Sequence, residues 1–395
     1  MEIDINQFYN NQTIIFLEDN FRKELFSKSV EKLGTIKEFK HFLDYKSDNI
    51  ISAWRTGKIN RGDNWITEQG IPLEKLIKIC RLNQLDVNSI QNKIICYKSR
   101  GKSLKINNPK LPIRISPELF RIIAHMIFDG SALEDNTHYY RNFNKGLLIN
   151  LKNDLDFVFG NIEITLKETM LILPSIIMKN LMNIFNFRAG TFDSSVPKIL
   201  FDLPKEYTSY FIQAFFDDEG TVSSDNLRFY SYNNKLISQT KKLLNIKFPN
   251  IKTGKLLHRQ KDTGMEYSFC ICSESIEDYL HDINTNHDSK LSKIQHLIRR
   301  KNKEWNHKLP NMTKIEILNS LLERSKTSYE LSQNILISPN KITEHLRGYS
   351  EKRKINSKGL IELGYVKRLK NGTYNSYTYN LTDKGANYLK SNHKK

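Results

Sequence analysis

Apolar residues gather in two similar stretches near the middle of the chain. Residues 122–130 read IIAHMIFDG and residues 212–220 read IQAFFDDEG, so each stretch is an apolar run that ends in an acid and a glycine. In the first stretch Ile123, Ala124 and Ile127 share one face at helical spacing, and the second stretch follows the same pattern less cleanly. The pattern predicts a buried helix for each stretch.

The two stretches align without a gap at an offset of 90 residues. Ala124 matches Ala214, and Gly130 matches Gly220. Past the motif, the same alignment matches Asp135, Asn136, Tyr140, Asn144 and Lys145 with Asp225, Asn226, Tyr230, Asn234 and Lys235, respectively. Because chance rarely gives such agreement at a fixed offset, the sequence predicts an internal duplication.

The acid that ends each predicted helix is Asp129 in the first stretch and Glu219 in the second. The glycine that follows suits the left-handed position beyond a helix, which puts both acids in a last turn where the helix dipole disfavours a carboxylate. If the two helices pack side by side in parallel, both acids meet at one tip, and like charges so close need a cation. Paired oxygen ligands are what Mg²⁺ uses in phosphodiester hydrolysis. The alternative is two ordinary helices with glycine caps and surface acids.

The two stretches resemble the two motifs of a LAGLIDADG (dodecapeptide, DOD-type) homing endonuclease in its double-motif, single-chain form. The resemblance implies an α+β core over residues 113–300, built from two pseudo-twofold αββαββα repeats at 113–205 and 206–300. It also implies cleavage of double-stranded DNA by a monomer that acts as a pseudo-dimer, with Mg²⁺ or Mn²⁺ as cofactor. The residues that it implies for catalysis and metal binding are the acids Asp129 and Glu219, helped by the carbonyl groups of Phe128 and Asp218.

The chain departs from the pattern of this family at several positions. Ala124 and Ala214 stand where glycine is usual. Phe128 and Asp218 stand where a small residue is common, which predicts crowding or repulsion at the metal tip. The basic residue that supports the transition state in this family cannot be matched by motif, and the unassigned candidates are Lys167, Lys255 and Lys261.

Strands with alternating polar and aromatic residues follow each motif helix. The clearest are residues 137–143 in the first half and 227–232 in the second. This alternation predicts one saddle-shaped sheet in each half. The concave face of such sheets suits the major groove of DNA. The candidates for DNA contacts on this face are His138, Tyr140, Arg141, Arg228, Tyr230, Tyr232, Lys255, His258, Arg259 and Lys261.

The region before this core, residues 1–96, is predicted to be mainly helical. One helix begins at Asp19 and stops at Gly34, a second is opened by the capping-box pair Thr35 and Glu38, and a third is capped by Ser47. This run resembles a Cro/repressor-type helix-turn-helix domain, and the alternative is a plain helical bundle with a solvated polar face. The residues that would contact DNA are Ser47, Asp48, Asn49, Ser52 and Arg55.

Two further helices are predicted in this region, over residues 73–82 and after Asp86. The basic, turn-rich stretch at residues 97–112 lacks periodicity and is predicted to be a linker to the core.

The last quarter of the chain, residues 301–395, holds 19 Lys and Arg against 8 Asp and Glu. Its order of helices, hairpin and final helix resembles the winged helix-turn-helix family, with the spacing from LGY to LTDKG as the most specific feature. The expected major-groove and wing contacts are Asn340, Lys341, Glu344, Arg347, Arg368 and Lys370. The alternative is a winged helix that docks on a protein.

Composition adds a preference for polyanions. The 395-residue chain carries a formal net charge of +18, although a bias towards Lys, Asn and Ile could come from AT-rich coding alone. Four cysteines do not make a disulfide framework, and neither a signal peptide nor an apolar run of membrane length is present. We therefore expect an intracellular, cytoplasmic protein without a membrane partner. Two functions remain: a DNA endonuclease, or a transcription regulator that has lost catalysis on the same scaffold.

Overall fold

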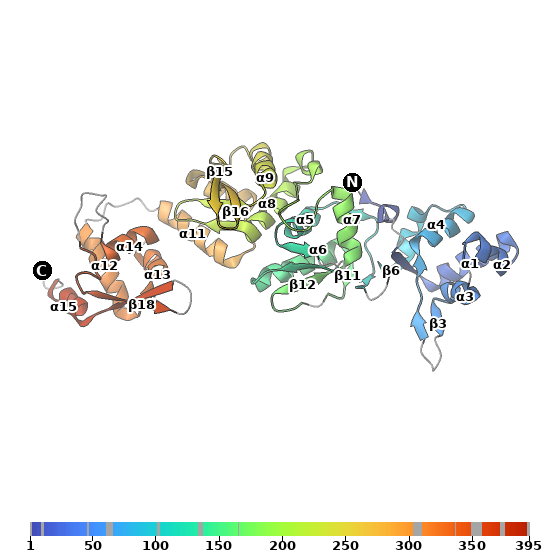
Figure 1. Cartoon of the computed structure of the whole chain (residues 1–395), viewed down its shortest axis with the longest axis horizontal. Coiled ribbons are helices and arrows are strands. Elements are labelled where there is room, and N and C mark those ends of the chain that lie inside the picture. The colour runs from blue at the N-terminus through green and yellow to red at the C-terminus, as the bar shows by residue number, and fades with distance from the viewer. Residues whose placement is uncertain are drawn as a thin grey trace. The chain divides into compact units, whose positions relative to one another are not determined.

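The computed structural model describes residues 2–8, 12–45, 47–60, 66–100, 103–132, 137–164, 166–302, 310–335, 337–348, 358–371 and 376–392. The chain forms two compact units (Figure 1). The first consists of Met1–Thr221 and Arg228–Asp288, and the second of Val222–Leu227 and Ser289–Lys395. Within the described residues, no helix is both long enough and apolar enough to cross a membrane.

The N-terminal part of the first unit contains the predicted helices. Its elements are β1 (Glu2–Ile3), η1 (Ile5–Phe8), β2 (Thr13–Leu17), α1 (Asp19–Leu33), α2 (Ile36–Phe42), α3 (Asp48–Thr56), β3 (Lys58–Asn60), β4 (Ile66–Glu68), β5 (Ile71–Pro72), α4 (Leu73–Leu82), η2 (Val87–Lys93), β6 (Ile94–Ser99), β7 (Ile106–Asn107) and β8 (Ile113–Arg114). Helix α1 ends at Gly34, whose φ is +92°. The Thr35 hydroxyl accepts the Glu38 N–H at 3.1 Å, as the capping box predicts.

The predicted linker at residues 97–112 contains parts of two strands. Strand β6 continues through Ser99, and β6 and β7 join a five-stranded sheet of order β11-β7-β6-β2-β5. The reason is local burial: Tyr97 is 1% exposed, and burial raises the pKa of its hydroxyl. The basic side chains of this stretch obscured its strand pattern, so β6 and β7 were not predicted.

The duplicated core gives the protein an α+β fold. Its elements are α5 (Pro117–Phe128), β9 (Gly130–Ala132), β10 (His138–Arg141), α6 (Lys145–Phe159), β11 (Asn161–Ile162), β12 (Met170–Leu173), α7 (Ser175–Phe185), η3 (Lys198–Phe201), α8 (Lys205–Glu219), β13 (Gly220–Val222), β14 (Leu227–Ser231), α9 (Asn234–Lys247), β15 (Leu257–Lys261), β16 (Gly264–Ile271), η4 (Ser273–Ser275) and α10 (Ile276–Asp282). Helices α5 and α8 pack on each other in the middle of this unit, with α6 against α5 and α9 against α8 (Figure 1).

Each half of the core has its own sheet. The strand order is β12-β10-β9 in the first half and β13-β14-β16-β15 in the second. In the first half, β11 pairs with β7 of the N-terminal sheet, and Leu166 forms an isolated bridge with Leu171 of β12.

The offset between the halves slips from 90 to 89 residues after the motif. Asn144 caps α6, whereas Asn233, not Asn234, caps α9. The residue two positions before each cap makes the same hydrogen bond in both halves. Asn142 Oδ1 accepts the Asn144 N–H at 2.9 Å, and Ser231 Oγ accepts the Asn233 N–H at 3.1 Å.

This slip changes which strand residues correspond. Tyr140 matches Phe229, and both are fully buried, while Arg141 matches Tyr230. The ungapped alignment past the motif was therefore wrong, since the chain between motif and cap is one residue longer in the first half. Asp135 and Asn136 lie outside the described residues.

The C-terminal unit packs helices against a small sheet. Its elements are α11 (Asp288–Asn302), α12 (Pro310–Glu323), β17 (Lys326–Thr327), α13 (Ser328–Ile335), α14 (Pro339–Arg347), β18 (Val366–Asn371), β19 (Ser376–Leu381) and α15 (Asp383–Asn392). The sheet order is β17-β19-β18, and Leu331, Ile342 and Leu346 lie in the buried core. Residues 360–363, which precede β18, form a hydrogen-bonded turn.

Candidate functional site

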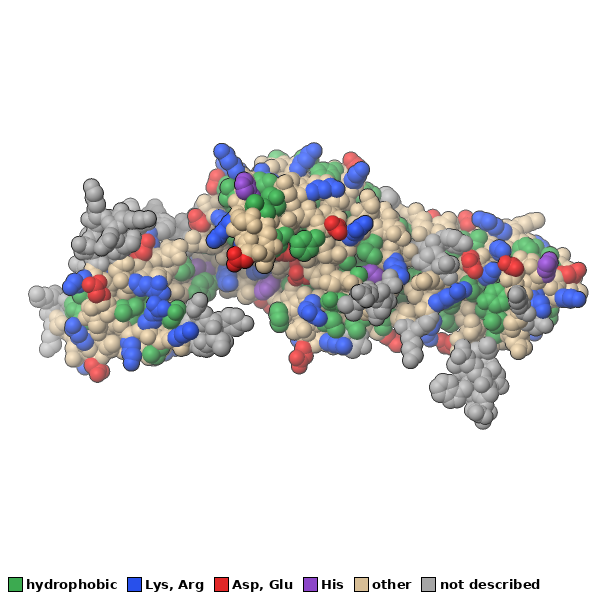
Figure 2. All heavy atoms as spheres, viewed as in Figure 1, with side chains coloured by type: hydrophobic (Ala, Val, Ile, Leu, Met, Phe, Trp, Pro, Cys, Tyr) green, Lys and Arg blue, Asp and Glu red, His purple; other side chains and the backbone are tan. Residues whose placement is uncertain are grey.

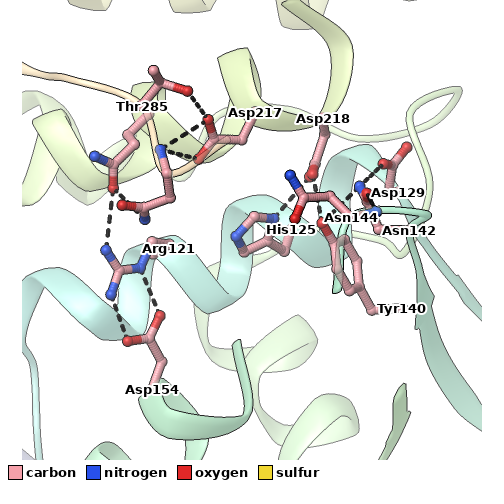
Figure 3. Close-up of polar contacts among 12 residues, drawn as sticks. Arg121, His125, Asp129, Tyr140, Asn142, Asn144, Asp154, Asp217, Asp218 and Thr285 are labelled. Atoms are coloured by element: carbon pink, nitrogen blue, oxygen red, sulfur yellow. Dashed lines mark hydrogen bonds and ion pairs between the residues drawn. The ribbon is translucent and has the colours of Figure 1, made fainter. Parts of the chain in front are cut away.

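The two motif helices pack in parallel. Arg121 of α5 donates a hydrogen bond to Gln213 of α8 at 3.1 Å, and one turn later His125 contacts Asp218 at 2.9 Å (Figure 3). Because the contacts advance in the same direction along both helices, their C-terminal ends lie at the same end of the pair. The acid that closes each motif is therefore at that shared end.

The glycines after the acids serve a purpose different from the one predicted. Gly220 has a φ of −83°, and Gly130 is not among the glycines with positive φ, so neither is a left-handed cap. A Cβ at Gly130 would lie 2.4 Å from the carbonyl oxygen of Met126, and one at Gly220 would lie 2.3 Å from the Phe216 ring. Both positions need glycine because the backbone at the start of the following strand lies against the last turn of the helix, which leaves no space for a Cβ.

The Asp129 carboxylate is held by a side chain from the neighbouring strand region. Asn142 donates from Nδ2 to Asp129 Oδ2 at 3.2 Å and to the Tyr140 hydroxyl at 3.1 Å. The Tyr140 hydroxyl in turn donates to Asp218 Oδ1 at 2.7 Å. In Figure 3 these residues form a continuous chain from the end of α5 to the buried face of α8.

The Asp218 side chain lies in the interface between the two halves. Its carboxylate is fully buried and is bound by His125 and Tyr140. Burial lowers the pKa of His125 to about 4, which favours the neutral ring at pH 7. Asp218 is thus bound by donors of the first half, and its repulsion at the metal tip stays a prediction.

Phe128 also turns into the helix interface. Its ring stacks on Phe215 at 4.1 Å between centroids and 3° between planes, and it meets Phe211 edge-on at 5.8 Å. The predicted crowding of the tip by this bulky residue is therefore wrong. The backbone carbonyl groups of Phe128 and Asp218 remain candidates for cation binding.

A second polar network lies further back along the helix pair. Arg121 forms a two-point ion pair with Asp154 at 2.6 Å, and Asp217 accepts hydrogen bonds from Thr285 and from the Asn286 N–H (Figure 3). The sequence analysis assigned no role to these residues, nor to Asn142. The usable signal was the presence of polar side chains within apolar motif helices, although their partners are distant in sequence.

Most of the predicted DNA contacts on the core sheets are accessible. Two are not: His138 and Tyr140 are 2% and 0% exposed, so neither ring is available to a groove. All five residues of β15 are exposed. Of the other candidates, Arg141, Lys255, His258, Arg259, Lys261 and Lys167 are exposed, and Arg228, Tyr230 and Tyr232 are half-buried. Lys261 forms an ion pair with Glu266.

The flanking candidates also lie mostly on the surface. Asn49, Ser52 and Arg55 of α3 are exposed and Ser47 is half-buried, while the Asp48 side chain lies outside the described part of the structure. In the C-terminal unit Asn340, Lys341, Arg347, Arg368 and Lys370 are exposed and Glu344 is half-buried. Arg368 lies over the Tyr377 ring at 3.4 Å. On the face shown in Figure 2, Lys and Arg side chains stand out over this unit.

The donors at the shared helix end are oxygens. Among the described residues, no group of three or more His, Cys, Asp and Glu side chains could hold a metal ion. Two carboxylates supported by backbone carbonyl groups nevertheless suit a hard cation that also binds water and phosphate, such as Mg²⁺ or Mn²⁺. The chemistry of the donor set therefore fits the predicted cofactor.

Comparison with known proteins gives distant similarities, and no family model matches the chain. The DNA polymerase II large subunit of Thermococcus kodakarensis is 23% identical over 234 residues, which is 56% of this chain but only 13% of that protein. Among solved structures, I-DmoI in complex with DNA and Mn has a TM-score of 0.31 and 16% identity, covering 43% of this chain and 98% of that one.

Full-length DUF199/WhiA from Thermatoga maritima has a TM-score of 0.33 and 13% identity, covering 60% of this chain and 90% of that one. Similarities at this level do not establish the function of the chain, which is therefore argued from the candidate site.

Proposed function

We propose that this protein is a site-specific endonuclease that hydrolyses double-stranded DNA with Mg²⁺ or Mn²⁺. The observation that carries the proposal is the parallel packing of α5 and α8, which brings the ends that bear Asp129 and Glu219 together. Each acid would help to hold a cation, together with the carbonyl groups of Phe128 and Asp218. A cation held by these residues would supply an activated water and would stabilise charge on the scissile phosphate.

The surface around this site supports DNA as the substrate. Strand β15 is exposed along its whole length and carries His258, Arg259 and Lys261, and Arg141 is exposed at the end of β10 in the other half. With a formal net charge of +18, the chain attracts a polyanion. These cations would follow the phosphate backbone while the acids meet the scissile bond.

The flanking parts would lengthen the recognised site. We propose the division of the chain into a helix-turn-helix part at residues 1–96, a connection at 97–112, the core at 113–300 and a winged helix-turn-helix at 301–395. The exposed residues Arg55 of α3 and Lys341 and Arg347 of α14 would contact DNA. The protein would act as a monomer, because the two halves supply both acids.

A randomised duplex library tests this proposal. The purified full-length protein is incubated with the library and Mg²⁺, and bound and cut molecules are sequenced separately. We expect double-strand cuts within one enriched sequence, lost on addition of EDTA. Binding should weaken steeply with salt, since phosphate contacts release counterions.

The competing function is a DNA-binding regulator without cleavage. The exposed cations of α14 and of strand β18 favour it, because they offer a DNA surface that needs no catalysis. Tight, metal-independent binding to one enriched sequence, with no nicked product under Mg²⁺ or Mn²⁺, would decide for the regulator and against the endonuclease.

A further inference from the structure

The interface between the two halves has a polar side. Asp218 of α8 is bound by His125 of α5 at 2.9 Å and by the Tyr140 hydroxyl of β10 at 2.7 Å. The side chains of His125 and Asp218 are 1% and 0% exposed. Two residues of the first half thus hold one buried carboxylate of the second half.

The symmetry-related side of the interface is aromatic. Phe128 of α5 stacks on Phe215 of α8 at 4.1 Å, and Phe215 meets Phe229 of β14 at 5.2 Å. With the offset of 90 in the helices and 89 in the strands, Phe128 corresponds to Asp218, Phe215 to His125 and Phe229 to Tyr140. The duplication therefore places a polar trio on one side of the helix pair and an aromatic trio on the other.

Contacts of the strand continue the polar trio to the motif acid Asp129. The Tyr140 hydroxyl accepts a hydrogen bond from Asn142 Nδ2 at 3.1 Å, and the same amide donates to Asp129 at 3.2 Å. Asn142 is fixed at its other end, because its Oδ1 accepts the Asn144 N–H at 2.9 Å. The orientation of the amide is thus set from both sides.

The counterpart of Asn142 in the second half is Ser231. Its hydroxyl accepts the Asn233 N–H at 3.1 Å, so it keeps the role of supporting the helix cap. Serine has a single, shorter hydroxyl donor in place of the two-proton amide of Asn142, and Phe229 has no hydroxyl to match that of Tyr140. The two halves therefore share the cap but differ in the chain of donors beyond it.

We propose that Asn142 is a positioning residue for Asp129, and that the two acids consequently act unequally on the two DNA strands. The inference rests on the proposed endonuclease function. A hydrogen-bonded partner that orients a metal-binding carboxylate typically changes metal affinity or activity by about 10- to 100-fold. Cutting of one strand depends on the chain from Asp218 through Tyr140 and Asn142 to Asp129, and cutting of the other strand does not.

The decisive variant is Asn142→Ser, which gives the first half the residue of the second and keeps a hydroxyl for the cap. Ser231→Ala is the matched control, because it alters the same position in the other half. The first readout uses the full-length protein and the duplex selected from the randomised library, labelled with different dyes at its two 5′ ends. The rate of cutting of each strand is then measured in a single turnover.

The second readout is independent of cleavage: Mn²⁺ binding to the full-length protein is followed by electron paramagnetic resonance without DNA. We expect Asn142→Ser to slow one strand about tenfold, to accumulate nicked duplex and to weaken one Mn²⁺ site about tenfold. Ser231→Ala should change either strand by no more than about twofold, on the same scale.

Equal slowing of both strands, or unchanged rates and Mn²⁺ affinity in Asn142→Ser, would overturn the inference while leaving the endonuclease in place. Failure of the wild-type protein to cut either strand would instead reject the proposed function, and the inference with it. A general loss of folding is recognised by a lowered melting temperature and lost DNA binding in the variant.

Discussion

At the scale of single residues, the polar side chains within the apolar motif helices decide how the two halves meet. The sequence marked Asp218 and Phe128 as departures from a familiar motif but predicted that they would disturb the metal tip. In the structure both turn into the helix interface, one towards His125 and the other towards Phe215. The direction of a side chain at a helix end depends on how the two packed helices are rotated relative to each other. That rotation cannot be predicted from a single sequence.

The buried Tyr140 hydroxyl gives a stability prediction. Tyr140→Phe leaves Asp218 with one fewer donor, so the free energy of unfolding should fall by about 1 to 3 kcal/mol. Urea denaturation measures the change. Tyr232→Phe is the matched control, because the Tyr232 hydroxyl contacts Thr263 in an exposed setting and its loss should cost within about 0.5 kcal/mol. An equal cost for both variants would contradict the assignment of Tyr140 to the interface network.

At the scale of elements, the helices and their caps were the most predictable features. The Thr35 capping box and the Ser338 cap of α14 follow local rules, since each depends on residues within one turn. Ser47 stands at the predicted N-cap of α3, but its side chain makes no cap hydrogen bond. Strands β6 and β7 were missed, because their partners β2 and β11 are distant in sequence. The slip in the repeat offset was missed for a similar reason, since only the caps reveal it.

The glycines that end the motif helices provide a test at this scale. In Gly130→Ala or Gly220→Ala the new methyl group would meet the preceding helical turn, so each should lower the free energy of unfolding by about 1 to 3 kcal/mol. Gly146→Ala at the start of α6 is the control, since its Cβ would meet only the Asn144 side chain, at 3.1 Å, and its cost should be within about 0.5 kcal/mol. Thermal and urea unfolding of the three variants compare these costs, and a milder effect at both motif glycines than at Gly146 would refute the explanation.

At the scale of the whole molecule, the chain combines a duplicated α+β core with flanking parts rich in Lys and Arg. The α+β class and the order of elements in the core follow from periodicity and from the repeat. The paired acids also follow from the repeat, because both motifs end alike. The supporting residues Asn142 and Tyr140 could not be predicted from the repeat. Asn142 contacts Asp129, and Tyr140 contacts Asp218 of the other half, and neither contact is visible in the sequence. The sequence thus predicted the acids of the candidate site but not what holds them.

The most direct test of the central claim compares cleavage by acid variants on the duplex selected from the library. Asp129→Asn and Glu219→Gln preserve size while removing a charge at the shared helix end, and Glu168→Gln removes an exposed acid elsewhere in the core as a control. We expect both motif variants to lose Mg²⁺-dependent cleavage and to keep DNA binding, while the control cuts like the wild type. Cleavage at the wild-type rate by either motif variant would contradict the central claim.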